Sequence, residues 1–187
     1  MKFHSQFFNC GVLAFTETQF LADVSNTEII ENWKPFRIYR QDHHTDKYLS
    51  MAIFIKDTLT MEDYEYIPSL NALKFVLVDI NLRKSRSFLL LHGKNNSIVS
   101  EYLEVLKYVL QNHRIDMVFG DFNINYVHKT QSLPLTSLML SLDYTQIVTE
   151  PTFVSSGSLL DHVYVRSTSV RIVENVVTSV YYSDHNA

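Results

Sequence analysis

Short runs of aliphatic and aromatic residues, rich in valine, isoleucine and phenylalanine, dominate the hydrophobic pattern of this 187-residue chain. Runs of this kind, bounded by polar residues, are typical of β-strands, because branched and aromatic side chains fit the half-buried surface of a sheet. We expect several neighbouring strands to pair as hairpins. The predicted strands cover residues 12–16, 36–39, 51–55, 73–82, 87–91, 115–119, 159–165 and 170–182.

Helical periodicity is clearest over residues 98–113. Charged residues separate apolar ones that recur there at three- and four-residue spacing. The apolar residues are Val99, Leu103, Leu106 and Leu110. This spacing is typical of an amphipathic helix. Two shorter helices are predicted over residues 25–33, with Ser25 or Asn26 as the cap, and around residues 135–142. Strands with a few covering helices predict two packed sheets flanked by helices.

The composition predicts one ordinary globular domain over residues 1–187. The chain is 46% apolar and has only four glycines and four prolines, with no repeat or low-complexity tract that would mark a linker. Its single cysteine, Cys10, excludes a disulfide within the chain and a CxxC metal site. No apolar run reaches membrane-spanning length and no secretory signal is visible. We expect an intracellular protein; the nucleus is compatible, although no nuclear signal is visible.

The formal net charge of −4 argues against the broad basic surface that nucleic-acid binders usually show. Four candidate site carboxylates, on Glu17, Asp121, Asp161 and Asp184, would equal that surplus if they cluster in one cleft. A bound cation would offset part of their charge. The remaining surface would then be nearly neutral, so the net charge leaves a DNA substrate open.

The strongest chemical signal is Gly120-Asp121-Phe122-Asn123, which directly follows an apolar run. Residues two apart on a strand point the same way, so the strand end delivers Asp121 and Asn123 to one face. Near the C-terminus, Asp184-His185 offers a carboxylate beside a titratable imidazole. These residue types are suited to hydrolysis.

Four stretches occur in a distinctive order: residues 13–18 (LAFTET), 120–123 (GDFN), 158–162 (SLLDH) and 183–185 (SDH). Together they resemble the endonuclease/exonuclease/phosphatase superfamily, whose members hydrolyse phosphate esters with a divalent cation. The resemblance implies an α/β fold, a four-layer α/β/β/α sandwich of two mainly antiparallel sheets. Relative to that family, we expect the chain to lack a terminal strand at each end, so that the domain is truncated there.

More narrowly, residues 116–125, 151–153 and 181–185 look like the endonuclease domains of LINE-type retrotransposons and Helitron-type transposons. Within that group the substrate is DNA. The resemblance therefore implies DNA as the partner and Mg²⁺ or Mn²⁺ as the cofactor. It also implies that Glu17 and Asp184 bind the cation.

The resemblance also implies roles for the remaining site residues. Asp121 would orient or deprotonate the attacking water, and Asn123 would hold the phosphate. His185 would face the phosphate while Asp161 bonds its ring and fixes the tautomer. His162 is excluded, because neighbouring strand residues face opposite ways and it is expected to point into packing.

Three further residues are predicted to bind substrate. His92 stands where related nucleases usually carry a tyrosine, and it can also donate a hydrogen bond to phosphate. Thr152 and Ser158 are candidate hydroxyl donors in the cleft, although ordinary loop polarity explains them equally well.

Plainer interpretations stay open for several of these residues. Glu17 could be a solvated strand-end residue, and Asp121 with Asn123 could form an Asx-turn that caps its own backbone. A solvated connection explains the adjacent histidines at 43–44 better than a metal cluster does, and a solvated hairpin tip explains the basic residues at 83–86 better than a DNA contact.

The sequence thus predicts a divalent-cation-dependent phosphodiesterase, and most specifically a DNA-nicking endonuclease of a mobile element. Two alternatives remain at this point. One is a phosphomonoesterase acting on a small or lipid phosphate, and the other is a catalytically inactive remnant of the domain.

Overall fold

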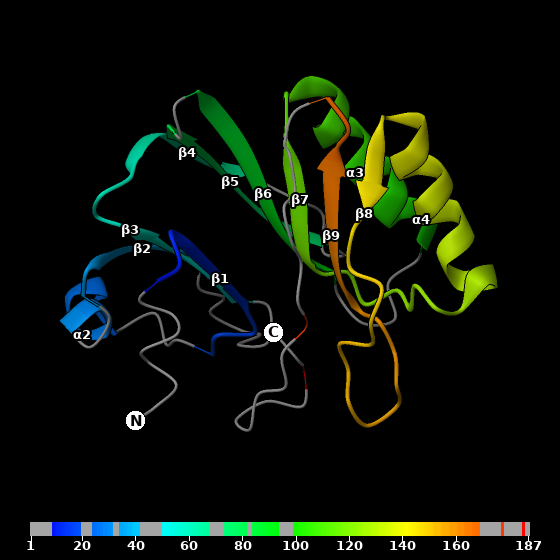
Figure 1. Ribbon diagram of the computed structural model, residues 1–187, viewed down its shortest axis with the longest axis horizontal. Coiled ribbons are helices and arrows are strands. Elements are labelled where there is room, and N and C mark those ends of the chain that lie inside the picture. Colours follow the sequence, from blue (N-terminus) through cyan, green and yellow to red (C-terminus); the bar gives the residue numbers. More distant parts are fainter. Residues whose placement is uncertain are drawn as a thin grey trace.

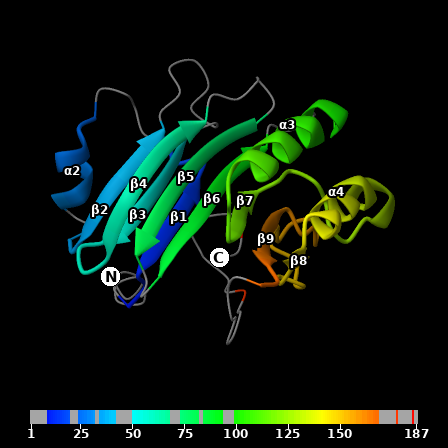
Figure 2. The same cartoon turned by 90° about the horizontal axis from the view of Figure 1, so that it is seen from above.

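The layers of the protein are visible in a computed structural model that describes residues 9–19, 24–31, 34–41, 50–67, 73–81, 84–93, 99–168, 177 and 185. Two sheets face each other (Figure 1). Helix α2 (Asn26–Glu31) covers the outer face of one sheet, and helices α3 (Val99–Asn112) and α4 (Lys129–Ser141) cover the outer face of the other. Figure 2 shows α2 and the α3–α4 pair on opposite sides of the molecule. The predicted four-layer α/β/β/α sandwich is confirmed.

The larger sheet has six strands in the order β4-β5-β6-β7-β9-β8. All neighbouring strands pair antiparallel except β6 and β7, which are parallel and are joined through α3. A parallel pair needs such a crossover, and this one places α3 on the sheet. The strands are β4 (Thr60–Ile67), β5 (Leu73–Asn81), β6 (Ser85–Gly93), β7 (Met117–Asp121), β8 (Tyr144–Gln146) and β9 (Asp161–Arg166).

The smaller sheet has three antiparallel strands in the order β1-β3-β2. They are β1 (Val12–Thr16), β2 (Phe36–Gln41) and β3 (Met51–Lys56). On the central strand β3, Ile53 packs between the two sheets, whereas the next residue, Phe54, packs in the core beside α2. The period of two along each strand therefore separates two apolar cores.

The same alternation divides the larger sheet. On β5, Phe75 and Leu77 pack in the core under α3 and α4, whereas Val76 and Val78 pack in the core between the sheets. A strand that is buried on both faces appears as an unbroken apolar run, which is how this segment looks in the sequence. The six-stranded sheet is therefore the common wall of both larger cores.

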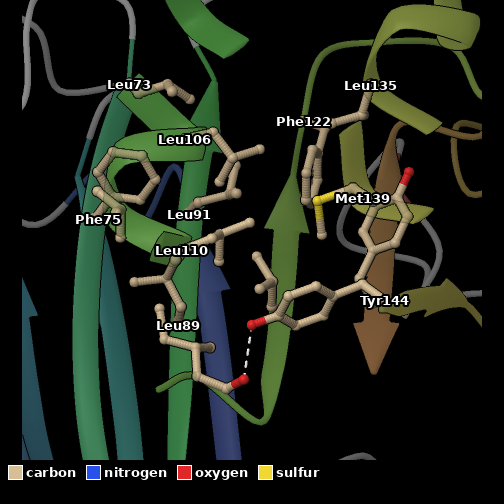
Figure 3. Packing of buried hydrophobic residues seen from close by; sticks show 14 of the residues in the cluster. Leu73, Phe75, Leu89, Leu91, Leu106, Leu110, Phe122, Leu135, Met139 and Tyr144 are labelled. Carbon is tan, nitrogen blue, oxygen red and sulfur yellow. Dashed lines mark hydrogen bonds between the residues drawn. The ribbon is translucent and has the colours of Figure 1, made fainter. Parts of the chain in front are cut away.

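The core under α3 and α4 is closed by a polar contact as well as by packing. Figure 3 shows Leu106 and Leu110 of α3 over the sheet near Leu91. The buried hydroxyl of Tyr144 donates a hydrogen bond of 2.7 Å to the carbonyl oxygen of Ile115. A tyrosine can be buried at low cost when its hydroxyl finds such an acceptor.

Helix α2 begins at a recognisable signal. Ser25 caps α2, since the Ser25 hydroxyl accepts the Glu28 N–H at 3.3 Å and the Glu28 carboxylate accepts the Ser25 N–H at 2.8 Å, which is a capping box. α4 begins before the predicted start at residue 135 and contains Pro134 in its interior.

In the described part of the chain, no helix is long and apolar enough to cross a membrane.

Most predicted elements are confirmed, and the misses have a physical reason. The sequence pattern missed β4 and β8, the two edge strands of the larger sheet. β4 is interrupted by acidic residues and β8 has only three residues, and short or charged strands are typical of sheet edges. The strand predicted over residues 170–182 lies outside the described residues except for position 177.

Candidate functional site

The inner face of the larger sheet changes from apolar to polar at one end of its strands. On β6, Leu90 packs between the sheets, and His92 follows two residues later on the same face. On β7, Phe119 is followed in the same way by Asp121. The strand register pairs His92 with Asp121 and Asp121 with Asp161. Strand pairing alone therefore brings three chemically active side chains together.

Gly120 allows β7 to approach β6 closely just before the site. Its φ of +137° lies in a region that other residues rarely adopt, and a Cβ added here would lie 2.0 Å from the carbonyl oxygen of Leu91. No side chain fits in that space. Asp121 can therefore occupy its position only because the preceding residue is glycine.

Asp121 and Asn123 form a closed hydrogen-bonded unit. The Asn123 N–H donates to Asp121 Oδ1 at 2.8 Å, and the Asn123 side-chain amide donates to Asp121 Oδ2 at 3.0 Å and to the Gly93 carbonyl oxygen at 2.6 Å. Asn123 has a φ of +50°, beyond the end of β7. The two side chains converge as predicted, but through an Asx-turn and a left-handed residue rather than through a continuous strand.

The pKa of the Asp121 carboxyl is raised to about 7. Burial is the largest cause, because it removes water from the charged form, and the negative charge of Asp161 raises the pKa further. The Asn123 N–H and the charge of His185 act in the opposite direction, while Glu17 adds to the rise. The environment therefore places this carboxyl between its protonated and ionised forms at neutral pH.

Glu17 reaches the site from the smaller sheet. It directly follows β1 with a φ of +53°, and its side chain is 44% exposed. The next residues are anchored by buried Ser50, whose hydroxyl accepts bonds from the Thr18 hydroxyl at 3.1 Å and the Gln19 N–H at 2.8 Å. Sequence reasoning missed Ser50, since a lone serine before a strand carries no signal of this contact.

His185 and Asp161 form the predicted pair. His185 Nδ1 donates to Asp161 Oδ2 at 2.7 Å, and both side chains are partly exposed. The ring of Phe153 contacts the His185 ring edge-on, with centroids 4.9 Å apart, and the two residues also form a β-bridge. The hydrogen bond to a carboxylate fixes which ring nitrogen carries the proton and leaves Nε2 as the other functional atom.

Thr152 and Ser158 organise the loop that leads into β9. The buried Thr152 hydroxyl oxygen accepts the N–H groups of Leu160 and Asp161 at 3.1 and 3.0 Å. The Ser158 hydroxyl accepts a bond of 3.2 Å from the Asn125 side chain. These contacts position Asp161, and the substrate contacts predicted for both hydroxyls stay a prediction. Sequence reasoning missed Asn125, which also accepts the Leu159 N–H at 3.2 Å.

His162 lies on the opposite face of β9, as predicted. It is fully buried, and its ring stacks on Phe122 with centroids 4.6 Å apart. Its Nε2–H lies 2.9 Å from the Ile124 carbonyl oxygen and 3.2 Å from the Leu159 carbonyl oxygen. Burial lowers the pKa of His162 to about 4, so the ring is neutral at physiological pH.

Two groups of possible cation ligands overlap at Asp121. One consists of Glu17, His92 and Asp121, and the other of Asp121, Asp161 and His185, with ligand atoms within 4.8 Å of one another in each group. Carboxylate oxygens and imidazole nitrogens are ordinary ligands of divalent cations, so this donor set fits such an ion. The first group is the better fit, because His185 Nδ1 is hydrogen-bonded to Asp161.

The remaining sequence candidates lie elsewhere or outside the described residues. Asp184, the second predicted cation ligand, is outside them, as are Arg83 and the histidines at positions 43–44. Arg86 is partly buried and pairs with the Asp116 carboxylate at 3.4 Å. This pairing ties Arg86 to the segment before β7 rather than leaving it at a solvated hairpin tip.

Neither a family model nor a curated protein matches the sequence. Solved structures do match the fold. The endonuclease domain of TRAS1, a telomere-specific non-LTR retrotransposon, matches with a TM-score of 0.72 and 14% identity, covering 98% of this chain and 86% of that one. This chain shares its fold.

Two further structures agree. A D. rerio TDP2 humanized by 14 mutations matches with a TM-score of 0.68 and 11% identity, covering 99% of this chain and 87% of that one. A truncated Caenorhabditis elegans TDP2 matches with a TM-score of 0.58 and 13% identity, covering 98% of this chain and 85% of that one. The resemblance predicted from the sequence motifs is therefore confirmed at the level of the fold.

Proposed function

We propose that this chain hydrolyses phosphodiesters with a divalent cation, and that it is a DNA-nicking endonuclease of a mobile element. One observation carries the proposal: acidic and imidazole side chains from distant segments converge at one end of the sheets, namely Glu17, Asp121, Asp161 and His185. The fold shared with the endonuclease domain of TRAS1 supports the choice of DNA.

Asp121 is proposed to prepare the attacking water. Its pKa of about 7 means that a large fraction of the carboxyl is ionised at neutral pH yet still basic enough to take a proton. A general base works best when its pKa lies near the operating pH. The Asn123 N–H holds one carboxyl oxygen in place, which orients the group for this task.

His185 and Asn123 are proposed to hold the phosphate. Because Nδ1 of His185 donates to Asp161, the atom that would donate to a phosphoryl oxygen is Nε2 of the protonated ring, and the Asp161 carboxylate stabilises that form. The Asn123 side-chain amide would exchange its bond to Asp121 for one to the substrate. Donors placed in this way stabilise the charge that develops on the phosphoryl oxygens.

Glu17 and Asp184 are proposed to hold the cation, which when bound would stabilise negative charge on the phosphate. The partly exposed Glu17 side chain gives a hydrated ion access from solvent. His92, Thr152 and Ser158 are proposed to line the substrate side of the site, with Thr152 also holding the start of β9.

The test is nicking of supercoiled plasmid by purified protein with Mg²⁺ or Mn²⁺. Changing Asp121 or His185 to alanine should slow nicking by about 10²–10⁴-fold, the usual contribution of a positioned acid or base. A matched control is His113→Ala, since His113 is also partly exposed but follows α3 away from the site. That variant should nick like the unchanged chain.

Undiminished nicking by either site variant would refute these assignments. A small phosphomonoester such as p-nitrophenyl phosphate belongs in the same assay. Hydrolysis of that ester without plasmid nicking would replace the endonuclease proposal with a phosphomonoesterase. No hydrolysis of either substrate by folded protein would favour an inactive remnant.

A further inference from the structure

His92 is an enclosed imidazole aimed at two carboxylates. Its side chain is only 2% exposed, and its Nε2 lies 3.6 Å from Glu17 Oε1 and 3.8 Å from Asp121 Oδ2. Both distances exceed the roughly 3.2 Å upper range of a good N–H to O hydrogen bond. The three side chains therefore face one another across a narrow gap.

The width of this gap is close to that between ligands of one ion. Two ligands about 2.1 Å from a metal at the tetrahedral angle lie about 3.4 Å apart. The observed separations of 3.6 and 3.8 Å differ from that value by only a few tenths of an ångström. Small side-chain movements would bring all three atoms onto a common ion.

The surrounding strands make two of these ligands rigid. β6, which carries His92, pairs with β5 on one side and β7 on the other, and His92 is directly opposite Asp121. Both oxygens of Asp121 are fixed by bonds from Asn123. Glu17 is the half-exposed member, so a cation would reach the site from its side and displace little structure.

We propose that His92 binds the divalent cation together with Glu17 and Asp121, so that the site favours Mn²⁺, Co²⁺ or Zn²⁺ over Mg²⁺. Mg²⁺ prefers an all-oxygen set, whereas imidazole nitrogen suits the transition metals. The inference rests on the proposed function in that it places a divalent cation at this site. It moves His92 from a substrate contact to a cation ligand, makes Asp121 a cation ligand instead of the group that takes a proton from water, and narrows the class of ion.

The test is metal binding by the full chain, prepared without a histidine tag. Co²⁺ alone is titrated while its visible absorption is recorded, and Mg²⁺ alone is titrated by its effect on the melting temperature. His92→Gln should weaken Co²⁺ binding by about tenfold or more and change Mg²⁺ binding by less than about threefold. An unchanged Co²⁺ spectrum and affinity in folded His92→Gln would overturn the proposal.

Two further variants serve as controls, one for Co²⁺ binding at other histidines and one for unfolding of His92→Gln. The double change His43→Gln and His44→Gln removes the adjacent histidine pair and should leave Co²⁺ binding intact; loss of binding there instead would overturn the assignment to His92. Because His92 is buried, His92→Gln could unfold the chain. Glu17→Gln alters a half-exposed side chain and should also weaken Co²⁺ binding, so unchanged affinity in this variant would equally count against the site.

Failure of this inference and failure of the proposed function give different results. Tight Co²⁺ binding through His92 without plasmid nicking by any metal form would remove the function and keep the cation site. Nicking with Mg²⁺ that His92→Gln does not alter, together with unchanged Co²⁺ binding, would remove the inference and keep the function.

Discussion

The two faces of the larger sheet carry opposite chemistry at the same strand ends. On the face toward the smaller sheet, Asp121 and Asp161 lie opposite each other, and the negative charge of Asp161 raises the pKa of Asp121. On the face toward α3 and α4, their immediate neighbours Phe122 and His162 stack in a dry core. One residue along the chain therefore separates a reactive position from a packing position.

The difference shows that burial alone does not make a functional group. Asp121 and His162 are both almost fully buried, yet their pKa values move in ways that suit different tasks. Burial is the largest cause of the raised pKa of the Asp121 carboxyl, and the charge of Asp161 raises that pKa further, whereas burial keeps the His162 ring neutral and bonded to carbonyl oxygens. Burial favours the neutral form of both groups, and their different partners then decide what each can do.

The largest expected effects on stability and on nicking come from one substitution on each face of the larger sheet. His162→Ala leaves a cavity beside Phe122 and should lower the free energy of unfolding by about 3–4 kcal/mol, as for other buried aromatic rings. Asp161→Asn should change stability little but slow plasmid nicking by about 100-fold, because His185 loses its charged partner. Urea denaturation and nicking rates measure the two effects.

Matched losses of stability and activity in both variants would contradict this separation of the two faces. The nicking rate of His162→Ala has to be expressed per folded molecule, which the same denaturation curves provide.

Gly120→Ala should damage both faces at once. The added Cβ would collide with the Leu91 carbonyl oxygen at 2.0 Å and force apart the parallel pair β6 and β7. We expect a loss of about 3 kcal/mol in the free energy of unfolding, measured in urea, and a loss of nicking. Gly157→Ala is the control, since its φ is also positive, at +65°, but nothing lies within 4 Å of the added Cβ. Equal stabilities of the two variants would show that the close approach is unimportant.

The smallest expected effect is a pH dependence of stability from His162. Its folded pKa of about 4 is below the ordinary value of 6.5, so the unfolded chain binds more protons between these values. The contribution of His162 to the free energy of unfolding is complete above pH 6.5. About 2–3 kcal/mol of it is lost as the pH falls toward 4. Unfolding in urea at a series of pH values measures it.

Asp121 acts in the opposite direction, because a raised carboxyl pKa makes its contribution fall as the pH rises from 3.8 to about 7. His162→Gln isolates the histidine, since glutamine can still donate to the carbonyl oxygens but does not titrate there. The difference in the free energy of unfolding between the unchanged chain and this variant should shrink below pH 6.5. A difference that is constant with pH would show that the ring is not held neutral.

Much of the fold followed from local patterns. Short apolar runs predicted most strands of both sheets, the spacing of Leu103 and Leu106 predicted α3, and Ser25 was one of the two residues predicted to cap α2, with Asn26. The pattern missed the edge strands β4 and β8, because β4 is interrupted by acidic residues and β8 has only three residues. The start of α4 was placed too late, at residue 135, since Pro134 masks the helical turn before it.

The sequence by itself determined which side chains face which way: the period of two along β7 and β9 sets Asp121 and Asp161 apart from Phe122 and His162. Only the tertiary structure decided that Glu17 and His92 meet Asp121. Their proximity depends on how the two sheets pack and on the register of the parallel strands β6 and β7, which α3 connects. No local sequence pattern contains the distance between segments so far apart. The shifted pKa of Asp121 has the same origin, because burial and neighbouring charge exist only once the sheets are assembled.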